Sequence, residues 1–353
     1  MASSAIDRRD RQRTIAILCL AAIAALCVGV SAQTNRLRLV STVWPPFTNT
    51  TGQARFALDL VEAATSRFGL TATTELVEPA TFTASLLTGP FNGSAAAWKD
   101  AARERVLLFS QPYLENRLIL VGKKGADVSA RVLGELRGKR IAIVEGYSYG
   151  DDVEKSGPTF VRARSEEDSL QRMLQGAADY TLMDDLVVQY IVEHYGEEAR
   201  TKLQFGATPL ITRQLHFAVR RNVPDAESII NRFNAQLRTM IADRTYHRLL
   251  HVDWIRADID GDGVTENIPA SDRVSPLEPQ RTYTLVTTPS QAQLVTTTQA
   301  PASSTPTSET PQRFYVGGNI YESWAKVPQT YKSNENMQPD ASQRTASLFT
   351  FRF

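Results

Sequence analysis

The chain has 353 residues, enough for two domains, and its 39 basic and 38 acidic side chains almost balance. A nucleic-acid-binding protein is usually basic overall or in a patch, so this balance argues against that class. The hydrophobic fraction of 42% is typical of a folded globular protein.

The first 32 residues predict an export signal. Four arginines between positions 8 and 13 precede an apolar run, Ile15–Val30, and a small-residue cleavage site ends at Ala32. The alternative is a retained membrane anchor, but the run is shorter than the ~20 residues that a spanning helix needs. We therefore expect cleavage after Ala32 and a periplasmic protein. Cys19 and Cys27 would leave with the signal, so the mature chain would contain no disulfide.

Alternating strand and helix patterns follow. Leu37–Val43 predicts a strand, which Trp44-Pro45-Pro46-Phe47 ends because proline cannot continue a ladder. Phe56–Phe68 has helical spacing, Thr71–Val77 is rich in strand formers, and Thr81–Leu87 predicts a short helix. This order predicts an α/β domain with helices packed on a sheet.

The same types of element continue toward the C-terminus. Strands are expected at Leu118–Val121, Lys139–Val144, Tyr180–Met183, Leu203–Phe205 and Leu215–Val219. Helices are expected at Ser165–Gln175, Leu186–Tyr195 and over most of Ala226–Trp254. Ser165 and Asp168 predict a capping box at the start of the first of these helices.

The stretch Gly93–Tyr113 has a recognisable order of residues. Small residues, Ser94–Ala97, lead to Trp98, and Arg103 stands six positions before Phe109 of a Phe-Ser-Gln-Pro-Tyr run. The order resembles the ligand-binding segment of bacterial family 3 extracellular solute-binding proteins, the periplasmic receptors for polar amino acids. Two departures are the Gln, where that family has Asp, and Trp98, where amino-acid binders usually have Thr.

The resemblance implies a type II periplasmic-binding-protein fold, in which an α/β lobe two is inserted in an α/β lobe one. Lobe one would be residues 35–122 plus 212–254, and lobe two residues 123–211. Two strands would cross between the lobes as a hinge.

The resemblance also implies a set of ligand contacts. Arg103 would bind the ligand carboxylate, since a guanidinium forks onto two oxygens, unless it is a solvated arginine at a helix start. Asp184 would bind the amine, or it caps the next helix while Asp185 takes the other role. Trp44 and Phe56 fall where the family has ligand-stacking aromatics, and ordinary core packing is the alternative for both.

Four further residues complete the predicted cleft. Ala96 would offer its backbone carbonyl, and Trp98 an indole N–H with a large face. Tyr147 and Ser148 follow Gly146 in a turn whose amides would meet the carboxylate. The bulk of Trp98 and Tyr147 should reshape the pocket and leaves the identity of the ligand open.

An acidic, glycine-rich segment within residues 255–274 predicts a structural Ca²⁺ site of the short DxDGDGxxE type. No glutamate stands at position 12 of the loop, so a complete EF-hand is not expected. An acidic turn without metal is the alternative. The expected ligands are Asp258, Asp260, Asp262, the Val264 carbonyl and Glu266.

The composition changes at Ser275. Residues 275–312 are rich in Thr, Ser, Pro and Gln, which predicts a disordered linker. Residues 313–353 regain aromatics and are interpreted as a C-terminal tail that docks on the lobes or stays loose.

These observations predict a solute-binding protein without a functional cofactor. It would capture a small molecule, an amino acid or related organic acid, for a membrane permease or sensor, and it would catalyse no reaction. One alternative is an enzyme resembling cyclohexadienyl dehydratases, with Asp100 or Asp184 as the acid. The other is a non-transport interaction protein, which the bulky Trp98 and Tyr147 would favour.

Overall fold

The computed structural model describes residues 35–260, 262–279, 283–284 and 312–333. The predicted signal peptide, most of the predicted linker and residues 334–353 lie outside them. Among the described residues, no helix combines the length and apolar character needed to cross a bilayer.

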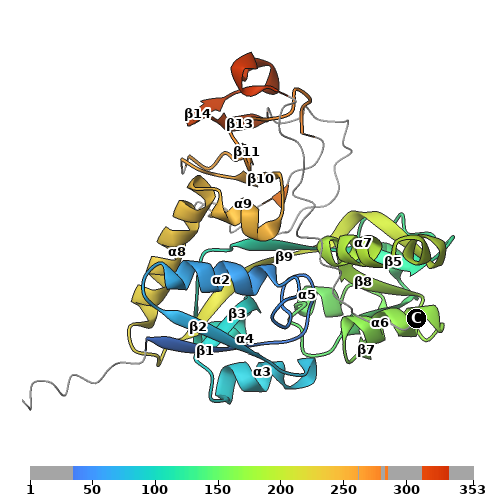
Figure 1. The fold of residues 1–353 in the computed structure, drawn as a ribbon. Coiled ribbons are helices and arrows are strands. Elements are labelled where there is room, and N and C mark those ends of the chain that lie inside the picture. The colour runs from blue at the N-terminus through green and yellow to red at the C-terminus, as the bar shows by residue number, and fades with distance from the viewer. Residues whose placement is uncertain (1–34, 261, 280–282, 285–311, 334–353) are drawn as a thin grey trace, which may run out of the picture. The chain divides into compact units, whose positions relative to one another are not determined.

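The larger sheet of the described chain has nine strands in the order β2-β1-β3-β9-β5-β8-β6-β7, with β4 paired to β9. We use lobe one for β1–β4 with α2, α3, α4 and α8, and lobe two for β6–β8 with α5, α6 and α7 (Figure 1). The strands are β1 (Arg36–Ser41), β2 (Thr71–Leu76), β3 (Gly93–Trp98), β4 (Leu107–Phe109), β5 (Leu114–Lys123), β6 (Arg140–Val144), β7 (Thr159–Ala163), β8 (Tyr180–Asp184) and β9 (Leu203–Arg220). The helices are α2 (Phe56–Ser66), α3 (Pro79–Thr88), α4 (Ala101–Glu104), α5 (Asp151–Glu154), α6 (Glu166–Leu174), α7 (Asp185–Lys202), α8 (Ala226–Ala242) and α9 (Thr245–Leu250), with a 3₁₀ turn at Leu133–Leu136.

The sheet of lobe one separates two apolar layers, as the alternation in β1 requires. Leu37 and Leu39 belong to the large core that includes residues of α2 and α8, whereas Val40 packs with Phe82 and Leu86 of α3. Figure 1 shows α2 and α3 on opposite sides of β1 and β2. Each fully buried leucine contributes about 1.5–3 kcal/mol to folding, so these layers fix where the ends of β1 and β3 lie.

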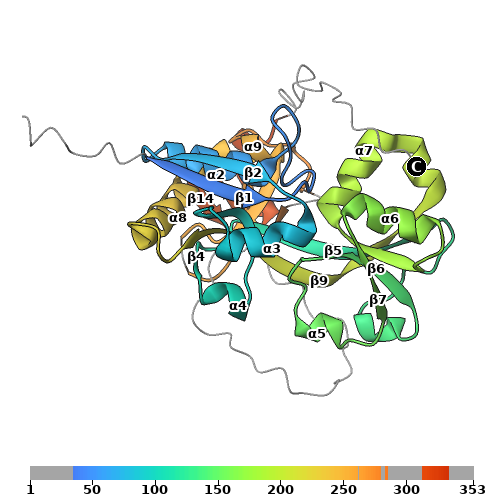
Figure 2. The same ribbon diagram turned by 90° about the horizontal axis from the view of Figure 1, so that it is seen from below.

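The strands β5 and β9 connect the two lobes. They pair antiparallel from Leu114–Leu215 to Lys123–Leu203, and Figure 2 shows them side by side between the lobes. β9 is one continuous strand, whereas the sequence predicted two separate ones. Pro209 lies between the predicted strands, and the pairing passes it with register shifts in β5 near Ile119. Irregular pairing of this kind lets a strand bend without ending.

The helix ends follow the capping pattern. Ser165 caps α6 and accepts a bond from the Asp168 N–H (3.1 Å), while the Asp168 carboxylate accepts from the Arg164 N–H (2.8 Å). α7 continues beyond the predicted end, with a break at Gly196, where φ is +39°. Trp254 was predicted within a helix and instead begins a strand.

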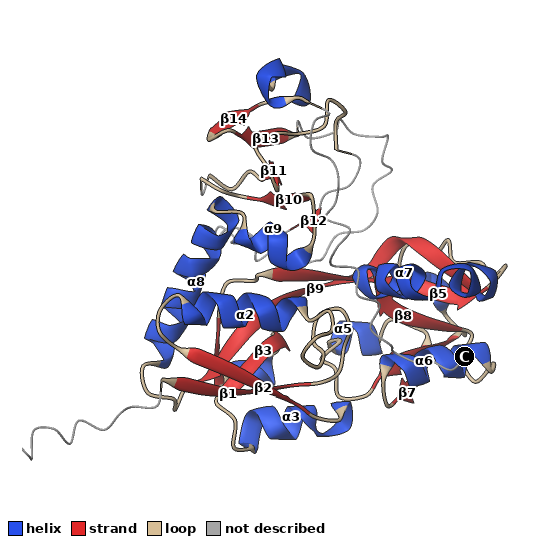
Figure 3. Cartoon of the chain, viewed as in Figure 1, coloured by secondary structure: helices blue, strands red, loops and turns tan. Residues whose placement is uncertain are grey.

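That strand belongs to a second, five-stranded sheet in the order β12-β10-β11-β13-β14 (Figure 3). Phe314, Val316 and Val327 form its buried core, against which the side chains of Trp254 and Trp324 pack. The described part of the predicted tail therefore folds. The elements are β10 (Trp254–Ala257), β11 (Glu266–Pro269), β12 (Tyr283–Thr284), β13 (Arg313–Val316) and β14 (Asn319–Tyr321), followed by 3₁₀ turns at Trp324–Lys326 and Gln329–Tyr331.

Candidate functional site

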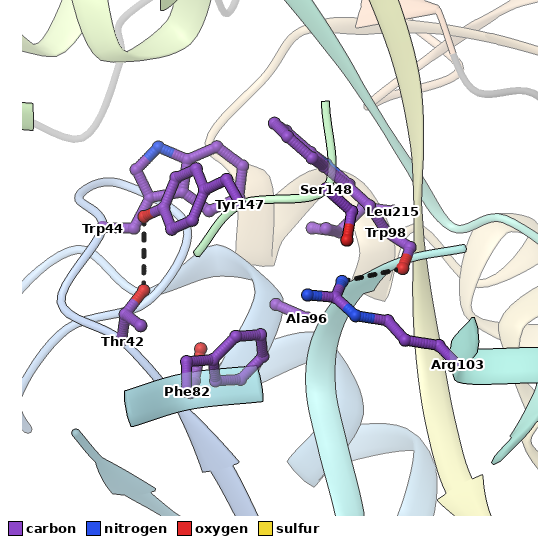
Figure 4. A pocket seen from close by; sticks show the side chains of 10 residues that line it. Thr42, Trp44, Phe82, Ala96, Trp98, Arg103, Tyr147, Ser148 and Leu215 are labelled. Carbon is purple, nitrogen blue, oxygen red and sulfur yellow. Dashed lines mark hydrogen bonds between the residues drawn. The ribbon is translucent and has the colours of Figure 1, made fainter. Parts of the chain in front are cut away.

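A small cavity lies where the ends of β1 and β3 face the turn after β6 (Figure 4). Its volume is about 20 Å³, which is room for roughly one water molecule and far too little for an amino acid. The lining residues are Ser41, Thr42, Trp44, Phe82, Ala96, Trp98, Arg103, Tyr147, Ser148 and Leu215.

Four aromatic rings pack against one another beside this cavity. Trp44 and Trp98 come from lobe one, and their ring centroids lie 5.7 Å apart in a T-shaped arrangement. Tyr147 of lobe two lies 5.6 Å from Trp44 and 5.7 Å from Trp98, and Tyr149 lies 5.5 Å from Trp98. The contacts of Trp98 with the other three rings are edge-to-face, which is favourable, so those with Tyr147 and Tyr149 contribute attraction between the lobes.

Arg103 is the cation of the cavity, and its side chain is only 3% exposed. Its Nη1 donates to the Trp98 carbonyl (2.9 Å) and its Nη2 to Thr83 Oγ1 (3.3 Å). Its Nε has no hydrogen-bond partner among the described residues, although Asp100 Oδ2 lies 3.4 Å away. Burial lowers the pKa of Arg103, and the charge of Asp100 partly opposes this effect.

Asp100 connects the cation to lobe two. One oxygen accepts from the Arg103 N–H (2.8 Å) and so caps α4, and the other accepts from Ser148 Oγ (2.6 Å). A second link between the lobes joins the hydroxyls of Thr42 and Tyr147 (3.3 Å), drawn as a dashed line in Figure 4. The protein's own Asp100 therefore supplies the carboxylate nearest to Arg103.

Asp184 is fully buried and serves as the cap of α7. Its Oδ1 accepts from the Leu186 N–H (2.8 Å), and its Oδ2 accepts from Asn116 Nδ2 (3.0 Å) and the Arg117 N–H (2.9 Å). Burial raises the pKa of Asp184 to about 8, with a further contribution from the charge of Asp185. Asp185 forms an ion pair with Arg117 (3.0 Å).

A buried hydrogen-bonded chain joins Asp184 to the aromatic rings. Trp98 Nε1 donates to Asn116 Oδ1 (2.7 Å), and Asn116 in turn donates to Asp184. Asn116 lies on β5 and is fully buried. The indole of Trp98 is therefore held in one orientation by a residue of the hinge.

Glu166 is a candidate that sequence reasoning did not identify. It is the first residue of α6, its side chain is half-buried, and its Oε2 is buried without a hydrogen-bond partner among the described residues. Burial, and then the charge of Asp184, raises the pKa of Glu166 to about 8. The charge of Glu166 in turn raises the pKa of Tyr147 and of Tyr149, after the larger effect of their burial.

The predicted ligand residues divide into two groups. Phe56 is half-buried at the start of α2 with its ring 6.1 Å from that of His251, and neither Phe56 nor Asp184 lines the cavity. The lining residues that were not predicted are Ser41, Thr42, Phe82 and Leu215. The available signal was the position of Thr42, two residues before Trp44 in the sequence. The predicted residues that line the cavity are Trp44, Ala96, Trp98, Arg103, Tyr147 and Ser148.

In the predicted Ca²⁺ loop, carboxylate oxygens of Asp258, Asp260 and Asp262 lie within 4.8 Å of one another. Arg313 of β13 reaches into this group, 2.7 Å from Asp262 and 3.2 Å from the buried Glu266. The loop therefore has both a set of oxygen ligands and a side-chain cation that competes for them.

Comparison with known proteins gives consistent results. The model of the bacterial extracellular solute-binding proteins, family 3, matches residues 39–256. A solved ancestral arginine-binding protein bound to arginine is 21% identical, with a TM-score of 0.52 over 62% of this chain and 97% of its own. An arginine periplasmic binding protein from Legionella pneumophila is 23% identical, with a TM-score of 0.51 over 61% of this chain and 98% of its own. The GluR0 ligand-binding core from Nostoc punctiforme in complex with L-glutamate is 20% identical, with a TM-score of 0.51 over 60% of this chain and 96% of its own. A search of curated protein sequences gave no significant match.

Proposed function

Because the chain belongs to the bacterial extracellular solute-binding proteins of family 3 and has the type II periplasmic-binding-protein fold, we propose that it captures a small amino-acid-like solute between its two lobes. The solute carries a carboxylate that binds Arg103. The protein is exported to the periplasm and delivers the solute to a membrane permease or a sensor. It performs this role by binding, without catalysis.

The observation that best supports this proposal is the incomplete hydrogen bonding of the buried Arg103 guanidinium. A buried charge is stable only when it is paired and its donors are satisfied. Among the described residues, the Nε of Arg103 has no hydrogen-bond partner, its Nη2 makes a long contact to Thr83, and the one carboxylate nearby is that of the half-buried Asp100, 3.4 Å from Nε. A ligand carboxylate would complete the guanidinium fork with two charge-assisted bonds.

Binding requires the lobes to part, since the cavity holds about 20 Å³. The polar links that would break include the bonds from Thr42 to Tyr147, from Ser148 to Asp100 and from Thr83 to the Gly146 carbonyl. A typical hydrogen bond contributes only about 0.5–1.5 kcal/mol net, so these links permit opening along the β5–β9 hinge.

The test is a thermal-shift screen of the mature chain, Gln33–Phe353, against amino acids and small organic acids. A ligand at 100 times its Kd should stabilise the protein by about 2.7 kcal/mol. Arg103→Ala should abolish the response, whereas Arg105→Ala, at an exposed position two residues away, should keep it. A response that survives in Arg103→Ala would refute this carboxylate site.

A second candidate function, dehydration by an enzyme similar to the cyclohexadienyl dehydratases, is favoured by one observation. The pKa of Asp184 is raised to about 8, so this group holds a proton at neutral pH, as a general acid must. Its oxygens accept three bonds inside the protein, which favours the capping role instead. Turnover of prephenate or arogenate that is lost in Asp184→Asn would establish the enzyme.

We also propose that the loop at residues 258–266 binds a structural Ca²⁺. Three carboxylates, with the Val264 carbonyl and Glu266, are the hard oxygen ligands that Ca²⁺ takes. Arg313 would have to leave the loop on binding. Added Ca²⁺, but not equal Mg²⁺, should raise the Tm of the wild type and not that of Asp260→Asn; equal responses in both proteins would reject the site.

A further inference from the structure

The side chain of Asp100 contacts two groups that were predicted to bind a ligand carboxylate. Its Oδ2 accepts a bond from Ser148 Oγ of lobe two (2.6 Å) and lies 3.4 Å from the Nε of Arg103 in lobe one. Arg103 and Ser148 both line the cavity, whereas Asp100 lies beside it. One carboxylate oxygen of the protein therefore already makes contacts that a ligand carboxylate would need.

This contact also joins the two lobes. Of the three hydrogen bonds between the lobes named above, only the bond from Ser148 to Asp100 involves a charged group. The other two join neutral groups and measure 3.3 Å each. A hydrogen bond to an ionised acceptor is shorter than a neutral one and about twice as strong. The bond to Asp100 therefore contributes more to lobe closure than either of the others.

The start of α4 holds Asp100 in this position. Its Oδ1 accepts from the Arg103 N–H (2.8 Å) and caps the helix, so the carboxylate cannot turn away without losing the cap. A ligand carboxylate bound to Arg103 and Ser148 would have to replace the contacts of Oδ2. It would also lie close to the negative charge of Asp100, and this repulsion weakens binding.

The inference drawn from this geometry rests on the proposed function, because it concerns the affinity of the same cleft. We infer that Asp100 is an internal competitor for the ligand carboxylate. Without ligand, Asp100 bridges Arg103 and Ser148 and holds the lobes closed, and Ser148 must leave Asp100 before a ligand enters. Asp100 therefore sets the affinity of the cleft, since a ligand binds only when its contacts exceed those of this bridge.

Small-angle X-ray scattering of the mature chain, Gln33–Phe353, measures lobe closure in the absence of ligand. Asp100→Asn can still cap α4 with its one oxygen, which leaves an amide N–H₂ group facing Arg103. Ser148→Ala removes the other end of the bridge without touching the cap. Both variants should have a larger radius of gyration than the wild type.

The matched control for the scattering experiment is Glu104→Gln. It removes a negative charge from the same short helix, at an exposed position where the carboxylate pairs with Lys99. Its radius of gyration should equal that of the wild type. Equal radii in the wild type, Asp100→Asn and Ser148→Ala would overturn the bridge.

Formate, the smallest carboxylate, measures the competition in a thermal-shift titration against equal concentrations of chloride. Its apparent Kd should be about three- to tenfold lower in Asp100→Asn than in the wild type, because one hydrogen bond and one like charge no longer oppose binding. Glu104→Gln should respond as the wild type does. An apparent Kd that is unchanged or higher in Asp100→Asn, or no response to formate in either protein, would overturn the competition.

The outcomes separate this inference from the proposed function. If the radii and the formate affinities are equal, but the wild type binds an amino acid through Arg103, the inference about Asp100 fails and the proposed function stands. If Asp100→Asn opens and binds formate more tightly, but no amino acid binds the wild type or the variant, the bridge stands and the proposed function fails.

Discussion

Replacing Glu166 by Gln should change how the stability of the protein depends on pH. The pKa of this carboxyl is near 4.5 in an exposed chain and is raised to about 8 in the fold. Between these values the folded state holds a proton that the unfolded state has released. The stabilisation from that proton is complete below pH 4.5 and is lost as the pH rises through 8, so wild-type stability should decline across this window.

The size of the decline follows from the same two values. Each pH unit between the two pKa values lowers the free energy of unfolding by about 1.4 kcal/mol, so the total decline is at most about 5 kcal/mol. The side chain of Glu166 is only half-buried, so water screens part of this cost and we expect about 2 kcal/mol. Glu166→Gln cannot titrate and should lose this part of the slope, while Asp184 keeps its own part in both proteins.

Urea denaturation at pH 5, 7 and 9 measures the effect. Relative to the wild type, Glu166→Gln should gain stability steadily as the pH rises. Glu167→Gln is the matched control, because it removes the same charge from the same turn of α6 at a position where the carboxylate accepts from Gln171. Parallel curves for the wild type and Glu166→Gln would refute the assignment of a raised pKa to this carboxyl.

Three further substitutions test other parts of the structure. Trp98→Phe should cost about 1–3 kcal/mol in urea denaturation, because it leaves Asn116 Oδ1 buried without its donor; a negligible loss would contradict that bond. Gly146→Ala should cost about 1–3 kcal/mol, since φ is +81° and an added Cβ would lie 2.5 Å from the Pro79 carbonyl oxygen; an unchanged urea midpoint would argue against this close approach. Burial lowers the pKa of His247 from 6.5 to about 4, so the stability of the wild type should fall as the pH drops through this range. His247→Leu should show a flatter dependence of Tm on pH there. An equally steep dependence in this variant would show that another group titrates.

Local patterns in the sequence predicted the helices and strands of lobe one well. The helix expected at Phe56–Phe68 is Phe56–Ser66 in the structure, and the strand expected at Thr71–Val77 is Thr71–Leu76. These elements were predictable because their signals, the apolar period and the turn residues, lie within the segment itself. The sequence could also predict that Ala96, Trp98 and Arg103 line one cavity, because these residues lie close together in the chain.

The remaining features depend on residues far apart in the sequence. β11 pairs with β13 across the predicted linker, from Glu266 to Arg313, so the segment after 313 could not be assigned to a sheet from its own pattern. Glu166 has the sequence signature of an ordinary first-turn acid, and only the fold brings it near Asp184 and Tyr147. Asp184 caps α7, a role that local sequence left open between Asp184 and Asp185.

The ring cluster of the cleft also gives the protein an intrinsic fluorescence reporter. The chain has four tryptophans, of which Trp44 and Trp98 lie in the cleft cluster, whereas Trp254 and Trp324 pack together in the second sheet. Indole emission responds to the polarity and the neighbours of the ring. In a variant with Trp254→Phe and Trp324→Phe, the tryptophan emission would therefore come only from the cleft, and it would report lobe opening without any attached dye.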